Sequence, residues 1–545
     1  MKIKLFAVLI ALAQTFHAQE ITGSWKGELN LSGMKLPLIL KITKENGHYI
    51  SVAKSPKQSD SSIPVDRTAF ADQQLTFEIN SINASYKGQF RTDHFEGIFT
   101  QHSFSVPLAL YRNNDSKDTE VQPGALKKTV NTGKIDDFLN YVAANKQATG
   151  SISIFREGKK MYHRDFGQDQ LSPLPWSSST GYQIGSVSKM ITAVMLMQLE
   201  EQGKIQLSDR LSKYYPDVPN AGKITLKQMM NHTSGLGDYV GEHYQWLFGK
   251  YVGDQAILDT IKKQGISFQP GEKTRYSNSG YYLLSRILEK VAQKPYHILL
   301  KEHITGKAGM KNTFSVMDHP SDVFRSYENT DGKWAEIQDF DFRNCIGLGD
   351  ITSTPEDMSI FINALFSNMF LKKESLEKML PEKGQSFGLG IMPIPFYNKV
   401  SFGHGGDTAG THTFVSYSPA EKYSFVLMVN GEKMPHNDLA IGILSILYDL
   451  EYPYPQFSQA NKIPATELQQ YAGEYRSEDI PLGLKIFVKD GVLFAEGTGQ
   501  PSFPLENNGK NEFSFDKAGI KIRFIPGKKQ LQLLQGGATY LFTGK

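Results

Sequence analysis

The chain has 545 residues, of which 40% are hydrophobic and 21% are charged, and this composition is typical of a globular protein rather than a disordered one. The formal net charge is only +3 and Lys and Arg form no long block, so nucleic acid is not expected as a partner. The length predicts about two to four domains.

The first 18 residues have the pattern of a secretory signal peptide. Lys2 and Lys4 precede nine apolar residues, 5–13, and a short segment ending at Ala18 follows. A helix that crosses a membrane needs about 20 apolar residues, so the segment predicts an exported protein, periplasmic or extracellular, with no stable membrane span. The single cysteine, Cys345, can form no internal disulfide.

Residues 19–112 predict an all-β domain, and residues 113–133, rich in Asn, Asp, Ser, Lys and Thr, predict a linker. Short apolar stretches separated by turn residues are typical of strands and hairpins. We expect a small β-barrel or sandwich. The expected strands are 36–42, 49–53, 75–79, 95–99 and 104–111.

Residues 134–452 mix helical and strand patterns, which predicts an α+β domain with an antiparallel sheet flanked by helices. One helix should begin at a cap formed by Asn278 or Ser279, and another at Thr354 with Pro355 in its first turn. The other expected elements are a helix at 134–145, strands at 150–156 and 160–166 joined at Glu157-Gly158, and strands at 413–417 and 423–430.

Residues 453–465 predict a second linker, and residues 466–545 predict a β-barrel-like domain. The strand pattern returns there with a hairpin turn at 489–492. Neither flanking β domain contains a catalytic cluster of ionisable residues, so both are expected to be structural, or to bind sugar or peptide. The expected C-terminal strands are 484–488, 492–495, 512–515, 520–524 and 530–534.

The most informative motif is Ser186-Val187-Ser188-Lys189, which directly precedes the uncharged run 190–199. The run predicts a buried helix, and Gly203 suits the position just after its end. Residues i and i+3 share one side of a helix, so the hydroxyl of Ser186 and the amine of Lys189 can meet, and the free N–H groups of the first turn add positive potential. A serine in this position can be activated as a nucleophile.

Two further motifs follow downstream. In Tyr276-Ser277-Asn278 the first and third residues point to one side of an extended segment, so a phenol and an amide face one cleft. In His404-Gly405-Gly406 the glycines allow a ligand to come close to the backbone.

With these motifs the chain resembles the β-lactamase-related serine hydrolases, the group of class C β-lactamases, D-alanyl-D-alanine carboxypeptidases, D-aminopeptidases and some esterases. The resemblance runs from about Lys134 to Leu450 and implies the β-lactamase/transpeptidase-like fold. In class C β-lactamases the third motif usually begins with lysine, whereas His404 stands first here, as in many D-peptidases and esterases of the group. This departure argues against an efficient β-lactamase. The resemblance also covers the connecting segments 203–209, 231–236, 270–271 and 353–357.

The resemblance implies a role for each motif side chain. Ser186 is the nucleophile that forms an acyl-enzyme. Lys189 and Tyr276 share the proton transfers, and either of them can be the base. Asn278 holds Lys189 or the substrate amide, and His404 tunes Tyr276 or contacts a substrate carboxylate.

The resemblance further implies an oxyanion hole made of the backbone N–H groups of Ser186 and Asp407, with Gly405 and Gly406 beside the substrate. The expected substrate is an amide or ester, in a short peptide containing a D-amino acid or in a small acyl ester, with peptidoglycan fragments among the candidate partners. No cofactor is expected. The alternatives are a non-catalytic, penicillin-binding-like peptide or cell-wall sensor and a weak β-lactamase.

Three other features are candidates for chemistry. His404, Asp407 and His412 could be drawn as a metal cluster, but their spacing fits no metal-helix pattern and the chain has no His-Glu-x-x-His, so no metal site is expected. His232 is expected to be a structural loop residue. Cys345 is expected to be a buried, inert thiol.

Overall fold

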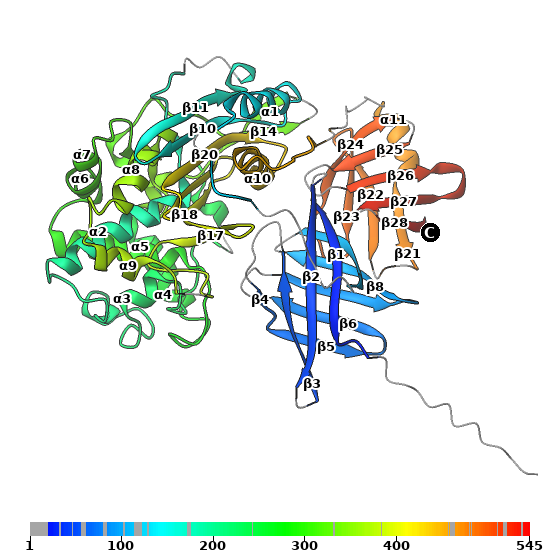
Figure 1. Ribbon diagram of the computed structural model, residues 1–545, viewed down its shortest axis with the longest axis horizontal. Helices are drawn as coiled ribbons and strands as arrows, with labels where there is room; N and C mark the ends of the chain where they lie inside the picture. Colours follow the sequence, from blue (N-terminus) through cyan, green and yellow to red (C-terminus); the bar gives the residue numbers. More distant parts are fainter. Residues whose placement is uncertain are drawn as a thin grey trace, which may run out of the picture.

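A computed structural model shows three parts, an N-terminal sheet, a central region of helices and strands, and a C-terminal barrel (Figure 1). The expected signal peptide, 1–18, and parts of the expected linkers, 113–133 and 453–465, lie outside the described residues. Within the described chain, no helix combines the length and the apolar character needed to span a bilayer. The structure describes residues 20–544 except for 32–33, 46, 56–61, 80–83, 102–103, 114–122, 128–129, 172–175, 242–243, 331–332, 383, 456, 458–463, 479, 481, 510, 516–519 and 536–537.

The N-terminal part is a nine-stranded antiparallel sheet in the order β4-β3-β2-β1-β9-β8-β7-β6-β5. Its core contains Trp25, whose ring meets that of Phe95 edge to face at 4.7 Å. The expected all-β character is confirmed, and all nine strands belong to one sheet. The strands are β1 (Gly23–Leu31), β2 (Met34–Glu45), β3 (His48–Lys54), β4 (Ile63–Pro64), β5 (Arg67–Ala71), β6 (Gln74–Ile79), β7 (Ala84–Phe90), β8 (His94–Gln101) and β9 (Phe104–Arg112).

The central part is built on an antiparallel sheet in the order β11-β10-β20-β19-β18-β17. Its strands are β10 (Ala148–Arg156), β11 (Lys159–Phe166), β17 (Met392–Phe396), β18 (Lys399–Asp407), β19 (His412–Ser418) and β20 (Tyr423–Glu432). The helices are α1 (Thr132–Ala144), α2 (Ser188–Glu201), α3 (Leu226–Met230), α4 (Asp254–Gln264), α5 (Asn278–Ala292), α6 (Tyr296–Leu300), α7 (Gly306–Ala308), α8 (Pro355–Phe366), α9 (Lys373–Met379) and α10 (His436–Leu447). Shorter strands are β12 (Tyr182–Gln183), β13 (Phe314–Ser315), β14 (Tyr327–Thr330), β15 (Lys333–Glu336) and β16 (Ile351–Ser353).

Strand β20 divides the central part into two hydrophobic cores. Val426 and Met428 join the core that contains α2, α5 and α8. Phe425, Leu427 and Val429 join the core that contains α1 and α10. Successive side chains of a strand point to opposite faces, so the uninterrupted apolar run of β20 is what a strand covered by helices on both faces requires. The expected α+β fold with helices flanking an antiparallel sheet is confirmed.

Helix α2 is the buried helix that the uncharged run predicts. Every residue from Ser188 to Leu199 is buried. At its end, Gly203 has a φ of +69°, and the N–H groups of Gly203 and Lys204 donate to the carbonyls of Glu200 and Leu199. This pair of bonds is a Schellman motif, so the predicted end of the helix is confirmed.

We expect Gly203→Ala to lower the free energy of unfolding by about 1 to 2 kcal/mol, because an L-residue is strained in the left-handed region. Gly222→Ala is the matched control, since a Cβ at either glycine would meet no atom within 4 Å, whereas only Gly203 has a positive φ. Thermal and denaturant unfolding of both variants measure the difference. Equal stability of the two variants would show that the backbone at residue 203 relaxes without cost.

Most other predicted elements of the central part are confirmed within a few residues. Glu157 and Gly158 both have positive φ, as a two-residue hairpin turn requires. Thr354 caps α8 by accepting the Asp357 N–H. The predicted cap of α5 is wrong by one residue or two, because Ser277 accepts the Gly280 N–H and Asn278 is already helical.

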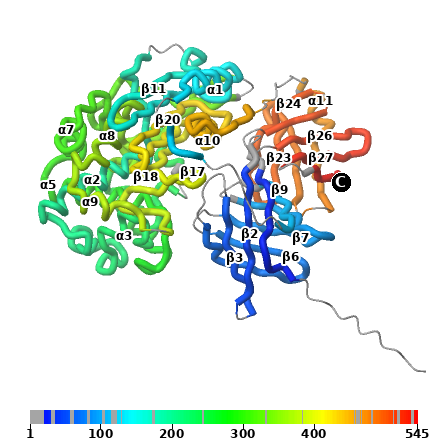
Figure 2. Tube along the Cα trace, viewed as in Figure 1, coloured from blue at the N-terminus to red at the C-terminus, as the bar shows by residue number. Residues whose placement is uncertain are grey.

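The C-terminal part is a closed barrel of eight strands, and it contacts both other parts. Ile98 of the N-terminal sheet packs against the barrel core, Arg91 donates to the Glu478 carbonyl, and Lys433 pairs with Glu506. In Figure 2 the N-terminal sheet, in blue, lies beside the C-terminal barrel, in orange. The elements are α11 (Ala465–Leu468), β21 (Gly473–Ser477), β22 (Gly483–Lys489), β23 (Val492–Gly497), β24 (Phe503–Gly509), β25 (Glu512–Phe515), β26 (Ile520–Ile525), β27 (Gln530–Gln535) and β28 (Ala538–Gly544).

Candidate active site

Ser186 and Lys189 are in hydrogen-bond contact at the start of α2. Ser186 lies in a 3-10 turn, η3 (Gly185–Val187), that runs directly into the helix. The Nζ atom of Lys189 donates to Ser186 Oγ at 2.8 Å and to the Leu348 carbonyl at 3.0 Å. The spacing of the first motif therefore does bring the hydroxyl and the amine together.

Lys189 is fully buried, and this burial controls its charge. Loss of hydration lowers the pKa of Lys189 to about 7, while the charge of Asp238 acts in the opposite direction. The amine also lies 4.9 Å from the centroid of the Tyr276 ring. At neutral pH a substantial fraction of Lys189 is uncharged and able to accept a proton.

Tyr276 lies just before α5, with its ring stacked on that of His232 at a centroid distance of 4.3 Å. The ring of His404 lies 6.4 Å from it. Burial raises the pKa of Tyr276 far above its ordinary value, although the nearby Ser186 hydroxyl acts to lower it. Among the described residues, no group meets the Tyr276 hydroxyl in hydrogen-bond geometry. Tyr276 therefore presents a protonated phenol beside Ser186.

His232 is a buried residue that contacts both Tyr276 and Ser277. It is 1% exposed with a φ of +62°, and its Nδ1 accepts the Ser277 N–H at 3.2 Å. Burial lowers the pKa of His232 well below its ordinary value, so the ring is neutral. The loop position matches the expectation, but the contacts with Tyr276 and Ser277 were not predicted.

Asn278 contacts a carboxylate that no motif indicated. Its Nδ2 donates to Asp238 Oδ2 at 3.1 Å. Burial raises the pKa of Asp238, against hydrogen bonds from Val240 and Asn278 that lower it. The hydrogen bonds found for Lys189 go to Ser186 and Leu348, so Asn278 contacts Asp238, whose charge raises the pKa of Lys189, rather than Lys189 itself.

His404 is a buried, neutral imidazole on β18. Burial lowers the pKa of His404 to about 4, and the charge of Lys189 adds to this effect. Its Nδ1 donates to the Gly405 carbonyl, and its Nε2 has no partner within the described part of the chain. The ring therefore offers one free acceptor nitrogen near Tyr276.

The strand β18 comes into direct backbone contact with the turn of Ser186. Strand β17 pairs with β18 only as far as Gly403, so it does not cover the part of β18 from His404 onward. A Cβ on Gly406 would lie 2.0 Å from the Ile184 carbonyl oxygen and 3.0 Å from the Ser186 nitrogen. A Cβ on Gly185 would lie 2.9 Å from the Asp407 nitrogen. The backbone N–H groups of Ser186 and Asp407 thus belong to one contact region.

The two glycines of the third motif have different surroundings. Gly406 must lack a side chain for β18 to dock on the turn, whereas the atom nearest to a Cβ on Gly405 would be the Thr413 oxygen at 4.0 Å. Alternation along the strand puts His404 and Gly406 on one face and Gly405 and Asp407 on the other. Gly406 is therefore a packing requirement of the site, and Gly405 is not.

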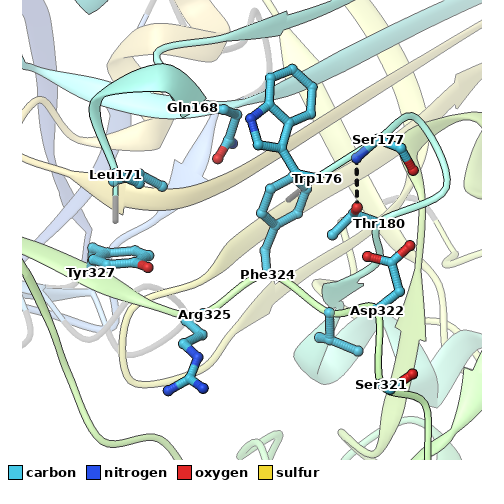
Figure 3. Close-up of a pocket in the computed structure, with 11 residues that line it drawn as sticks. Gln168, Leu171, Trp176, Ser177, Thr180, Ser321, Asp322, Phe324, Arg325 and Tyr327 are labelled. Atoms are coloured by element: carbon cyan, nitrogen blue, oxygen red, sulfur yellow. Dashed lines mark hydrogen bonds between the residues drawn. The ribbon is translucent and has the colours of Figure 1, made fainter. Parts of the chain in front are cut away.

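A pocket of about 470 Å³ lies elsewhere on the central part, between the segment after β11 and the approach to β14. Figure 3 shows the rings of Trp176 and Phe324 in it and the hydrogen bond from the Ser177 N–H to Thr180 Oγ1. The ring centroids are 6.3 Å apart, and the hydrogen bond is 2.8 Å long. None of the motif residues lines this pocket. It is therefore distinct from the cluster around Ser186.

Comparisons with known proteins agree with this geometry. The sequence profile of the Beta-lactamase family matches residues 136–448. PbpX of Bacillus subtilis (strain 168), provisionally named a penicillin-binding protein, is 30% identical over 336 residues, which cover 60% of this chain and 82% of that protein. Teichoic acid D-alanine hydrolase of Staphylococcus aureus is 27% identical over 332 residues, 58% of this chain and 79% of that protein. The D-amino acid amidase from Ochrobactrum anthropi SV3, complexed with D-phenylalanine, shares the fold with a TM-score of 0.53 at 22% identity, covering 58% of this chain and 99% of that one.

Proposed function

Because the chain belongs to the beta-lactamase family and is a serine hydrolase, we propose that it cleaves an amide or ester bond through an acyl-enzyme on Ser186. The observation that carries this proposal is the 2.8 Å hydrogen bond from Lys189 Nζ to Ser186 Oγ. A nucleophile in contact with its base is the arrangement that covalent catalysis by serine needs.

In this mechanism Lys189 is the general base. With a pKa of about 7 it is partly neutral at physiological pH, so it can take the Ser186 proton as Oγ attacks the substrate carbonyl. Tyr276 is poorly suited to that task, because burial raises its pKa and disfavours the phenolate. We assign to Tyr276 the transfer of a proton to the leaving group, with the proton returned from Lys189. In the second half of the reaction, water takes the place of the leaving group and attacks the acyl-enzyme. Its proton passes through Tyr276 to Lys189, and Lys189 returns a proton to Ser186 Oγ as the product leaves.

The remaining residues position these groups. The N–H groups of Ser186 and Asp407 are proposed to bind the oxyanion, a role their shared contact region supports. The Asn278–Asp238 pair is proposed to tune the charge of Lys189, and His232 to hold the Tyr276 ring. His404 is proposed to accept a hydrogen bond from the substrate or from Tyr276 at its free Nε2.

The proposed substrate is a short peptide containing a D-amino acid, or a small acyl ester. A relative named as a teichoic acid D-alanine hydrolase supports a D-alanyl ester among the candidates. The basic and apolar pattern of residues 1–18 supports export to the periplasm or beyond the cell, where peptidoglycan fragments are available as partners. A non-catalytic cell-wall sensor and a weak β-lactamase remain the alternatives that the test separates.

Covalent labelling with a fluorophosphonate and with a fluorescent penicillin tests this proposal. We expect the wild type to be labelled and Ser186→Ala to remain unlabelled. Hydrolysis of p-nitrophenyl acetate, a D-alanyl anilide and a chromogenic cephalosporin by the same preparations then ranks the substrate classes. Equal labelling of the two proteins would refute the assignment of Ser186, and tight ligand binding without turnover of any of the three substrates would favour the sensor.

A further inference from the structure

Two histidines and two carboxylates meet where β18, β19, β20 and α10 come together. His412 lies between Asp407 and Glu432, with its Nδ1 2.7 Å from Asp407 Oδ1 and its Nε2 3.4 Å from Glu432 Oε1. His436 lies between the same two carboxylates, with its Nδ1 2.9 Å from Glu432 Oε2 and its Nε2 3.9 Å from Asp407 Oδ1. The two imidazole rings stack with centroids 4.4 Å apart and planes 10° apart.

The fold fixes each of these side chains on a rigid element. Asp407 and His412 are the last paired residues of the β18–β19 ladder. Glu432 ends β20, and its Oε2 accepts the backbone N–H of His436, the first residue of α10. The cluster in the structure differs from the group His404, Asp407 and His412 that the sequence suggested. His404 donates to Gly405 and lies on the other face of β18. His436 and Glu432 instead lie beside Asp407 and His412.

The orientation of the rings divides their nitrogens into two sets. Glu432 accepts a hydrogen bond from His436 Nδ1 at 2.9 Å and lies 3.4 Å from His412 Nε2, while His412 Nδ1 and His436 Nε2 are directed to Asp407. Histidines that bind metals almost always give their other N–H to a carboxylate or carbonyl. Glu432 is placed to serve both histidines in this way. Because the ring planes are only 10° apart and a nitrogen lone pair lies in its ring plane, one ring has to turn before both inner nitrogens, those directed to Asp407, face one ion.

The inner atoms have the number and chemistry of a transition-metal site. One oxygen of Asp407 and one nitrogen of each histidine lie within 4.8 Å of one another. Donor atoms around a tetrahedral Zn²⁺ with bonds of about 2.0–2.2 Å stand about 3.4 Å apart, and the separations of 2.7 and 3.9 Å from Asp407 lie on either side of this value. The Asp407 side chain is 67% exposed, which gives an ion an entry and leaves a coordination position for water.

We propose that Asp407, His412 and His436 bind a divalent transition-metal ion, with Zn²⁺ as the best match to a nitrogen, nitrogen and oxygen ligand set. Glu432 orients both histidines from outside the ligand shell. An ion pair network without metal is the competing explanation: the hydrogen bonds from His412 Nδ1 to Asp407 and from His436 Nδ1 to Glu432 need only one N–H from each ring, so metal analysis has to separate the two.

The proposed ion would tie the end of β18 to β19 and to α10. Asp407 would then have two functions, because its side chain holds the ion while its backbone N–H serves the oxyanion; this second function rests on the proposed acyl-enzyme mechanism. Bound Zn²⁺ is therefore expected to stabilise the fold and to raise turnover by fixing that N–H.

Equilibrium dialysis of a tag-free, EDTA-treated full chain against Zn²⁺, with metal analysis and thermal unfolding, tests the proposal. We expect about one Zn²⁺ per chain and a higher Tm with Zn²⁺ than with Mg²⁺, which prefers oxygen ligands. The double variant His412→Asn, His436→Asn should lose this binding, and Glu432→Gln should weaken it by about 10 to 100-fold. His48→Asn, which changes an exposed histidine of the N-terminal sheet, should bind as the wild type does.

Failure of the wild type to retain Zn²⁺, or equal retention by the double variant, would overturn the proposal in favour of a metal-free ion pair network. Unfolding in EDTA shows whether each variant is folded without metal, so loss of binding is separated from loss of structure. Fluorophosphonate labelling of Ser186 in the same samples keeps the two proposals apart. Intact labelling without metal binding refutes the ion alone, and metal binding without labelling refutes the mechanism alone.

Discussion

Replacing Lys189 by methionine is expected to lower kcat/KM by about 100 to 10,000-fold, because the buried aliphatic chain is kept while the general base is lost. In the wild type kcat/KM should rise with pH through an apparent pKa of about 7. Below that pH Lys189 is an ammonium and cannot accept the Ser186 proton. His404, with a pKa of about 4, stays neutral across this range and contributes no step to it.

The pH profile of the free enzyme, measured as kcat/KM with one chromogenic ester, checks this expectation. In Lys189→Met the residual activity should lack the step near pH 7. In Asp238→Asn the step should move to lower pH, because the Asp238 charge raises the pKa of Lys189 and its removal lets burial lower that pKa further. Persistence of the wild-type step in Lys189→Met would show that another group titrates there, and that the base has been assigned wrongly.

Elements with strong local signals could be predicted from the sequence, whereas several strands of the N-terminal sheet could not. Helix α2 has an uncharged run and a glycine at its end, so both its position and its end were predictable. Strands β1, β4, β5 and β7 were missed. Strands β1 and β7 each contain a glycine, which weakens a strand pattern, although β8 and β10 also contain one and were predicted. A Cβ on Gly27 would lie 2.3 Å from the Ala109 oxygen, and one on Gly88 would lie 2.2 Å from the Tyr86 hydroxyl. Tertiary packing demands these glycines, and no local pattern reveals it.

The candidate site shows the same division between short motifs and long-range contacts. Ser186 and Lys189 are three residues apart in the chain, so helix geometry was enough to predict their contact. Asp238 reaches the site through a loop, and its bond to Asn278 spans 40 residues. His436 lies 24 residues beyond His412 at the start of another element, so only the folded sheet brings the two rings together. The motifs therefore indicated the reacting groups. The charges that set the pKa of Lys189, such as that of Asp238, come from residues that only the fold brings near.

Gly406→Ala is expected to lower kcat by about 100 to 1000-fold, the usual cost of losing one oxyanion donor. The added methyl group would collide with the Ile184 oxygen at 2.0 Å and press on the Ser186 nitrogen at 3.0 Å. Both atoms are backbone, so neither can turn aside as a flexible side chain would. The turn of Ser186 and the strand end at Asp407 must therefore separate, which moves the two N–H groups apart.

Gly405→Ala is the matched control, because the atom nearest to its Cβ would be the Thr413 oxygen at 4.0 Å. It should keep kcat within a few-fold of the wild type, since a contact at this distance needs no rearrangement. Steady-state kinetics with one ester substrate and thermal unfolding of both variants separate catalysis from stability. A Gly406→Ala enzyme as active as Gly405→Ala would mean that the contact between β18 and the turn does not set the oxyanion geometry. The N–H of Asp407 would then lose its proposed role, whereas the Ser186–Lys189 pair would keep its own.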